Sequence, residues 1–217
     1  MKNLTILLLI ILIHTSVDAQ NGSRFNINIS DSSEIVYSIK ELTQRQFEAS
    51  ISDLVQEKSR YDVDNSNDKW LSKLSNASIS DSCIIITHRG NDLKLCNRKN
   101  ESDERNNELF RVLDYKCENV IIQNEGYEWW RYVVVNNANY FILPNAPLFI
   151  DCNRIYSYGN YYAEGQFKYW DMASGKSMGF DTFNYSLKSC YRDGEMFYIV
   201  FTSSDNSEKK FIELTIE

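Results

Sequence analysis

The sequence predicts a mainly β fold: an antiparallel meander of blade-like four-strand units, arranged as a propeller or a sandwich, with one N-terminal amphipathic helix. Three observations support this prediction. Runs rich in β-branched and aromatic residues recur from Cys83 to the end of the chain. Clusters of Gly, Asn, Asp and Ser separate the runs, and these residues adopt turn conformations that β-branched residues resist. Only the segment before residue 82 has the apolar period of a long helix.

Four pairs of these runs flank a short polar cluster, so each pair is expected to form a hairpin. Successive clusters are centred 48, 36 and 32 residues apart, which is close to the period of propeller blades. Two four-strand units can be traced, over residues 108–143 and 147–180. The turns of the four hairpins are predicted at residues 89–92, 136–139, 173–176 and 205–208.

A strand is predicted over Ser32–Lys40, where polar and apolar residues alternate, and the helix follows it. Thr43 and Gln46 have the spacing of a capping box, which satisfies free amides at a helix start. From there to Lys58, apolar residues fall on one helix face that should pack on a sheet. These residues are Phe47, Ile51, Leu54 and Val55.

Residues 1–19 have the pattern of a secretory signal peptide, with a basic start, a short apolar core and small residues before a cut after Ala19. The apolar run is too short to span a bilayer and no later run matches it, so no integral membrane span is expected. The predicted divisions are this signal peptide, a strand–helix–linker segment over residues 20–81 and a β-repeat domain over residues 82–217. The mature protein is expected to be secreted or periplasmic.

The chain carries 23 basic and 30 acidic residues, a formal net charge of −7. Removal of the predicted signal peptide takes away Lys2 and Asp18, which leaves 22 basic and 29 acidic residues and the same net charge. The charges are scattered and form no basic run. No nucleic-acid or anionic-membrane partner is therefore expected.

All five cysteines follow the predicted signal peptide, and an exported chain can form disulfides. An odd number leaves at least one thiol unpaired in a monomer. Cys83 and Cys96 flank the first hairpin and are the best candidate pair. With a turn at residues 90–91, however, Cys83 would face Arg98, so a bridge needs a different register. At least three of the cysteines are expected to be buried as small apolar residues.

The polar segment Tyr61–Trp70 is predicted to be a linker. It imitates the first half of an EF-hand calcium loop, in which alternate oxygens surround the ion. Asn67 stands where that loop needs glycine, and Lys73 stands where it needs a bidentate glutamate, so no metal and no cofactor are assigned. The residues that imitate the loop are Asp62, Asp64, Ser66 and Asp68.

The stretch WDMASGKSMGF, Trp170–Phe180, contains two patterns typical of enzymes. Its G-x-S-x-G around Ser177 matches a hydrolase nucleophile elbow, which needs a helix directly after the serine and a later histidine. No helical period follows Ser177, and His88, the only histidine of the mature chain, precedes it. The Gly-Lys-Ser motif of the same stretch lacks the preceding glycine that a phosphate-binding loop requires. The stretch is therefore predicted to be a hairpin, with residues 173–176 as the turn and Ser177 in the returning strand.

The same stretch supports a family resemblance. FKYWDMASGKSMG, Phe167–Gly179, resembles the third strand, turn and fourth strand of a WD-type propeller blade, and PLFIDCNRIYSYG, Pro147–Gly159, resembles the opening strand pair. Together with GYEWWRYVVVNN, these stretches make the chain similar to a group of secreted bacterial proteins with blade-type β repeats, over most of residues 82–217. The resemblance implies no catalytic residues. True WD blades contain Gly-His dipeptides that this chain lacks, and an open meander, a small sandwich and a four-bladed ring stay open as alternatives.

Tyrosine and tryptophan are dense over Tyr127–Tyr132 and Tyr156–Trp170. Their flat apolar faces and polar tips suit the binding of sugars or proteins. Neighbouring strand residues face opposite sides, so at least one of the two adjacent tryptophans should be core, whereas the stretch from residue 158 to 162 is expected at a strand end and loop. The candidate ligand-binding residues are Trp129, Trp130, Tyr158, Tyr161 and Tyr162.

The sequence thus favours an exported, non-catalytic binding or interaction module whose partner is an unknown protein or glycan. No catalytic residue is assigned. The alternatives are a secreted hydrolase, with a glycosidase ranked above an esterase, and a purely structural envelope protein. A glycosidase requires two carboxylates at a fixed separation in space, and the sequence alone does not give that separation for pairs such as Glu164 and Asp171.

Overall fold

The computed structural model describes residues 25–32, 35–58, 61, 68–88, 90–99, 102–103, 105, 107–162 and 164–217. The predicted signal peptide, residues 1–19, lies outside the described residues, as do residues 62–67 of the calcium-like segment. Over the described residues the fold is mainly β and consists of four antiparallel sheets, as the sequence predicts. No helix in this part of the chain is both long enough and apolar enough to cross a membrane.

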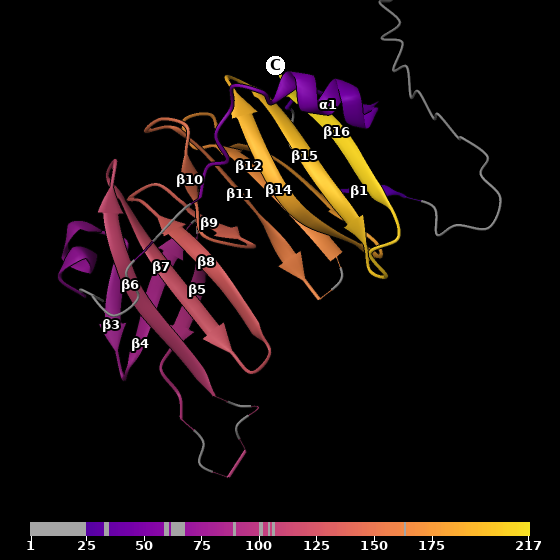
Figure 1. Ribbon diagram of the computed structural model, residues 1–217. Helices are drawn as coiled ribbons and strands as arrows, with labels where there is room; N and C mark the ends of the chain where they lie inside the picture. The colour runs from indigo at the N-terminus through magenta and orange to yellow at the C-terminus, as the bar shows by residue number, and fades with distance from the viewer. Residues whose placement is uncertain are drawn as a thin grey trace, which may run out of the picture.

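From β3 to β16 the chain builds the four sheets one after another, and β1 and β2 add an edge strand to each of the last two (Figure 1). Sheet I contains β3 (Ala77–Ser80), β4 (Cys83–His88) and β5 (Asn91–Cys96). Sheet II contains β6 (Glu108–Lys116), β7 (Asn119–Gly126), β8 (Trp129–Val135) and β9 (Tyr140–Leu143). Sheet III contains β10 (Leu148–Phe149), β11 (Arg154–Tyr161), β12 (Glu164–Asp171), β13 (Lys176–Thr182) and, beside β13, β1 (Ile27–Ser32). Sheet IV contains β14 (Tyr185–Asp193), β15 (Met196–Ser203), β16 (Lys209–Ile216) and, beside β16, β2 (Tyr37–Leu42).

The four predicted hairpins are present as β4–β5, β8–β9, β12–β13 and β15–β16. The two four-strand units traced in the sequence correspond to sheet II and to the consecutive strands of sheet III. The first turn comes one residue earlier than predicted, because His88 pairs with Asn91. This register places Cys83 directly opposite Cys96.

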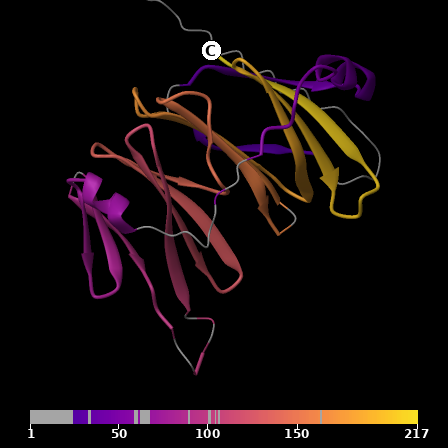
Figure 2. The same cartoon turned by 60° about the vertical axis from the view of Figure 1, so that its left-hand side comes forward.

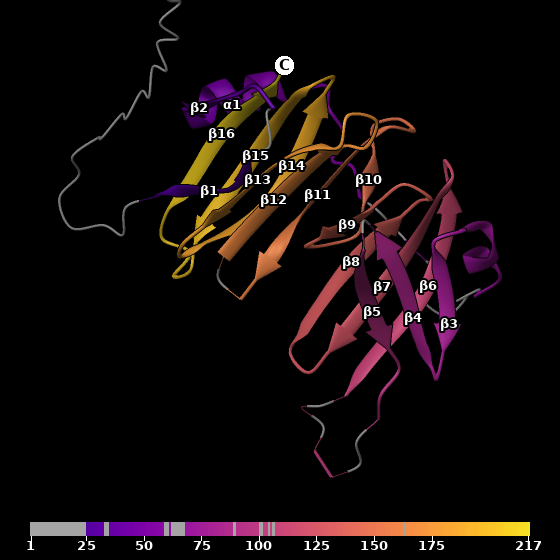
Figure 3. The same ribbon diagram turned by 180° about the vertical axis from the view of Figure 1, so that it is seen from behind.

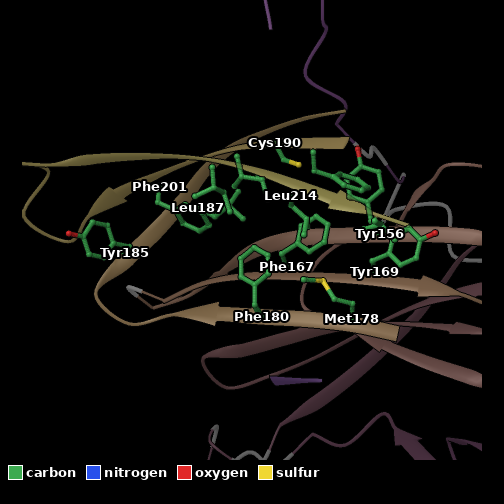
Figure 4. Packing of buried hydrophobic residues seen from close by; sticks show 14 residues of the cluster. Tyr156, Phe167, Tyr169, Met178, Phe180, Tyr185, Leu187, Cys190, Phe201 and Leu214 are labelled. Carbon is green, nitrogen blue, oxygen red and sulfur yellow. The ribbon is translucent and has the colours of Figure 1, made fainter. Parts of the chain in front are cut away.

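The sheets pack face to face in chain order, I on II, II on III and III on IV. Figure 2 shows sheets I and II on one side of the molecule and sheets III and IV on the other. Strand residues alternate between two faces, so a sheet that lies between two others contributes side chains to two cores. In β12, Phe167 and Tyr169 enter the III/IV core, which Figure 4 shows in detail, while Trp170 packs in the II/III core.

Residues 25–80 are shared among three of the sheets, to which they supply β1, β2 and β3. Seen from behind, β1 and β2 lie on edges of the two C-terminal sheets (Figure 3). The strand predicted over Ser32–Lys40 therefore has the wrong bounds, because its two ends belong to different strands. The sequence pattern alone does not reveal the change of sheet between them.

The short α-helix α1 (Gln44–Ser50) begins at the predicted capping box. The Thr43 hydroxyl accepts a hydrogen bond from the amide of Gln46, and the Gln46 side chain accepts one from the amide of Thr43. The helix ends eight residues before the predicted end at Lys58. Gln56 instead forms a β-bridge with Tyr191 of β14, which requires extended chain there.

The early end of α1 changes which apolar residues it buries. Phe47 packs on sheet IV, with its ring centroid 6.1 Å from that of Tyr191 and 5.0 Å from that of Phe211. Val55, predicted on the same face, is 82% exposed. A 3₁₀ helix, η2 (Asp68–Lys73), takes the end of the predicted linker, where Leu71 is buried in the I/II core.

Two disulfides correct the prediction that at least three cysteines are buried as apolar residues. Cys83 is bonded to Cys96 within the β4–β5 hairpin, and Cys117 is bonded to Cys152. The second bond joins the β6–β7 turn of sheet II to the β10–β11 connection of sheet III. Cys190 is the free cysteine and is buried in the III/IV core, so the odd count did predict an unpaired thiol.

Candidate functional site

The Trp170–Phe180 stretch is a hairpin, and Ser177 lies in its returning strand, as predicted. Trp170 pairs with Ser177 across β12 and β13, and Gly175 in the turn has a φ of 72°, which glycine adopts without strain. Ser177 is 3% exposed and sits on a strand rather than at a strand-to-helix turn. The hydroxyl therefore does not have the geometry of a nucleophile elbow.

The carboxylates Glu164 and Asp171 lie at opposite ends of β12. Seven residues of strand separate them, which corresponds to about 23 Å. The carboxyl groups of a glycosidase pair lie roughly 5–10 Å apart, so these two do not form one. Among the described residues, no cluster of three or more His, Cys, Asp or Glu side chains could hold a metal ion.

A groove with a volume of about 960 Å³ lies at the free end of sheet II. The β7–β8 hairpin, the start of β6 and residues 97–99 surround it, at the lower end of the molecule in Figure 1. We call it the aromatic groove, and its defining residues are Tyr127, Trp129, Trp130 and Tyr132, with Arg98 and Glu125.

The two adjacent tryptophans line the groove from opposite faces of β8. Trp130 is 51% exposed, so a large part of its indole is open to solvent. Trp129 lies against Gly126, where its indole occupies the space of a Cβ, and the Arg131 guanidinium lies 5.4 Å from the indole centroid. Neither tryptophan is fully buried, so the prediction that at least one is core is wrong. Both lie at the start of β8, before the buried run at Val133–Val135.

The groove has a polar floor beside its aromatic rings. The Arg111 guanidinium donates to the Glu125 carboxylate at 2.7 Å, and the Gln123 amide donates to the same carboxylate at 3.4 Å. Gln123 Oε1 is shielded from solvent without a hydrogen-bond partner among the described residues, a feature that native proteins tolerate rarely. Burial raises the pKa of Tyr132, and the nearby Glu125 carboxylate raises that pKa further.

The β11–β12 hairpin of sheet III brings two further tyrosines to the rim of the groove. Tyr161 and Tyr162 are 46% and 70% exposed, and their ring centroids lie 4.7 Å apart in an edge-to-face arrangement. The Tyr162 hydroxyl donates to the Glu128 carboxylate at 3.2 Å, and this hydrogen bond raises the pKa of Tyr162. Since Glu128 lines the groove, Tyr162 lies at its edge.

Four of the five candidate residues thus come together, and Tyr158 does not. Tyr158 lies within β11 on the face toward sheet IV and packs against the III/IV core. Its hydroxyl donates to the Glu57 carbonyl oxygen at 2.9 Å and accepts from the Gln56 amide at 3.3 Å. The strand extends to Tyr161, so only Tyr162 occupies the turn that was expected from residue 158 onward.

The sequence analysis missed the polar residues of the floor. Gln123 and Glu125 belong to β7 and pair with Tyr132 and Trp130, respectively. Cross-strand partners share a face, so the β7–β8 register would have identified both residues. The signal was the polar end of the NVIIQNEG run, which the hairpin places beside the tryptophans.

The chain matches no protein-family model, and neither a curated protein nor a solved structure is similar enough to count as a match. The resemblance to secreted proteins with blade-type repeats therefore stays a prediction. The function has to be argued from the aromatic groove itself.

Proposed function

We propose that this chain is an exported, non-catalytic binding protein that holds a neutral oligosaccharide in the aromatic groove. One observation supports the proposal most directly: an exposed tryptophan face, Trp130, lines a large cavity whose floor carries a fixed carboxylate, Glu125. In this proposal the four meander sheets are successive blade-like units, and sheet II presents the ligand site at its free end.

The chemistry of the groove suits a sugar ring. Each sugar has an apolar face of C–H groups, which can stack on an indole or phenol face, and an edge of hydroxyl groups that need hydrogen bonds. Trp130 and Tyr127, which is 47% exposed, offer such faces. Glu125 offers a carboxylate acceptor on the same sheet face as Trp130. The cavity volume lies in the range of sites for small ligands.

The charges around the groove favour a neutral ligand. Arg98 and Lys99 contribute two positive charges to its lining, and three glutamates contribute negative charges. Neither sign dominates, so the groove has no field that would select a strongly acidic or basic partner. The three glutamates are Glu108, Glu125 and Glu128.

Export is the second part of the proposal. The pattern of residues 1–19 predicts a signal peptide, and two disulfides are typical of proteins that fold in an oxidising compartment. A secreted or periplasmic protein would meet polysaccharides outside the cytoplasm. Ser177 lacks the geometry of an esterase elbow, and Glu164 and Asp171 lie too far apart to act as a glycosidase pair, so neither set of residues supports a hydrolase.

Calorimetric titration tests the proposal with neutral hexasaccharides built from glucose, mannose, xylose or N-acetylglucosamine. We expect saturable binding of at least one hexasaccharide by the protein without its signal peptide. Trp130→Ala should weaken that binding about thirtyfold or more, because truncation of a central aromatic contact costs about 2 kcal/mol. Phe183→Ala is the matched control, since Phe183 is 61% exposed in another turn and does not line the groove.

Two results would contradict the proposal. Equal loss of affinity in Trp130→Ala and Phe183→Ala would indicate a general effect of removing exposed aromatic residues. Absence of saturable binding to every hexasaccharide, with binding of a protein partner that depends on Trp130, would identify the groove as a protein interface instead.

A further inference from the structure

We infer that the oligosaccharide site spans two sheets, with Tyr161 and Tyr162 of sheet III forming a second subsite beside the aromatic groove of sheet II. This inference rests on the proposed function and adds the length of the ligand to it. A short oligosaccharide would occupy the groove alone. A longer one would continue across the rim onto the β11–β12 hairpin.

The first argument is the position of the two tyrosines. The hydrogen bond from Tyr162 to Glu128 joins the tips of the β11–β12 and β7–β8 hairpins, although the two residues are 34 positions apart in the chain. Both tips lie at the same end of the molecule (Figure 1). Tyr127, the neighbour of Glu128, lines the groove, so the aromatic surface runs from the groove onto the second hairpin.

The second argument is the conformation of Tyr162. Its φ is 52°, in the left-handed region, where a bulky side chain is uncommon and glycine or asparagine is the usual choice. Short hairpin turns require this conformation, as Glu128 and Asn184 also show, so it places Tyr162 at the tip of the β11–β12 hairpin. Here the conformation accompanies an exposed ring at the groove rim rather than a buried one.

The third argument is the way the two tips are held relative to each other. They belong to different sheets, so their spacing depends on the II/III interface. The Cys117–Cys152 disulfide crosses this interface at the opposite ends of β7 and β11, about 25 Å along the strands from the tips. The disulfide therefore tethers the far ends of the two sheets and restrains their relative motion, and with it the distance between the groove and the tyrosine subsite.

The inference makes a prediction about ligand length. For the sugar that binds best, the unmodified protein should bind the hexasaccharide about tenfold more tightly than the trisaccharide, because the longer chain gains the tyrosine contacts. The double variant Tyr161→Ala/Tyr162→Ala should lose this difference and keep the trisaccharide affinity. Both side chains are exposed, so their removal leaves the cores intact.

The disulfide is tested in the same assay. Cys117→Ala/Cys152→Ala should weaken hexasaccharide binding and leave trisaccharide binding unchanged. Cys83→Ala/Cys96→Ala is the matched control, because that disulfide lies within sheet I, and it should change neither affinity. Circular dichroism and the burial of Cys190 against a thiol reagent verify that each variant is folded.

The outcomes separate the inference from the proposed function. If Trp130→Ala abolishes binding while the double tyrosine variant binds the hexasaccharide as tightly as the unmodified protein, the second subsite does not exist. Oligosaccharide binding in the aromatic groove would still be supported. If neither saccharide binds the unmodified protein, the proposed function fails together with the inference. An unchanged hexasaccharide affinity in folded Cys117→Ala/Cys152→Ala would remove the role assigned to the disulfide.

Discussion

The II/III and III/IV interfaces join sheets of similar construction in different ways. The III/IV core contains fourteen buried residues, many of them aromatic, and the described residues place no disulfide across it. The II/III core contains five buried residues and is crossed by the Cys117–Cys152 disulfide. A wide apolar interface holds its sheets along their whole length, whereas a narrow one leaves one end uncovered. The aromatic groove lies at that uncovered end.

Two phenylalanine truncations should show the largest difference between the interfaces. Phe197 contacts three rings of sheet III, with centroids 5.0 Å from Tyr156, 5.2 Å from Phe167 and 6.3 Å from Tyr169. We expect Phe197→Ala to lower the free energy of unfolding by about 5 kcal/mol in urea titrations, because the rigid core cannot close the cavity.

The matched variant in the narrow interface is Phe141→Ala. Phe141 is 1% exposed, with its ring centroid 4.7 Å from that of Trp170. We expect a loss of about 3 kcal/mol, because a thin core relaxes more easily around the lost ring. A larger loss for Phe141→Ala than for Phe197→Ala would overturn the comparison of the two cores.

The disulfides should differ in the free energy that they contribute. Cys117–Cys152 closes a loop of 35 residues and Cys83–Cys96 closes one of 13 residues. In the chain-entropy model these correspond to about 4 and about 3 kcal/mol, so Cys117→Ala/Cys152→Ala should be the less stable double variant. Equal or reversed losses in urea unfolding would show that the inter-sheet disulfide does not contribute more to the free energy of unfolding than the disulfide within sheet I.

A smaller effect is expected at Glu57, which links the edges of sheets III and IV. The Glu57 carboxylate accepts from the Tyr156 hydroxyl at 3.0 Å and from the Arg192 guanidinium at 2.8 Å. Glu57→Gln leaves the partly buried Arg192 without its counter-charge, so the free energy of unfolding should fall by about 1–2 kcal/mol. Glu41→Gln, which removes a more exposed pair with Lys210, should cost less than about 0.5 kcal/mol.

The smallest expected effect is at Asp205 in the β15–β16 turn. Hydrogen bonds from the hydroxyls of Ser203 and Ser207 lower the pKa of Asp205 to about 2. A carboxyl with a depressed pKa stabilises the fold above its ordinary pKa of 3.8, and this contribution disappears as the pH falls toward 2. NMR titration should find this low pKa, and Ser207→Ala should raise it. An unchanged pKa in that variant would refute the assigned cause.

Much of the β architecture could be predicted from the sequence, because the determinants were local. Each of the four predicted hairpin turns is marked by glycine, asparagine or aspartate between apolar runs, and the capping box of α1 is a four-residue pattern. The error in the first turn was a single residue, yet it reversed the expectation for Cys83 and Cys96. A one-residue shift of a hairpin turn moves every cross-strand partner by two residues, here from Arg98 to Cys96, so register is the property that a local pattern determines least well.

The remaining features depend on contacts between distant segments. The end of α1 follows from the bridge between Gln56 and Tyr191, and the Cys117–Cys152 bond follows from the packing of sheet II on sheet III. Four aromatic residues that come together at the candidate site could be selected from the sequence, because tyrosine and tryptophan cluster there. Tyr158 was misplaced because the length of β11, not the composition, decides which residue reaches the turn.

Indole NMR signals test the central claim most directly, because the chain contains four tryptophans in three environments. Trp129 and Trp130 line the groove, Trp70 packs against the I/II core, and Trp170 lies in the II/III core. On titration with the hexasaccharide that binds best, we expect the indole N–H signals of Trp129 and Trp130 to shift while those of Trp70 and Trp170 stay in place. Shifts confined to Trp70 or Trp170 at saturating ligand would contradict the account.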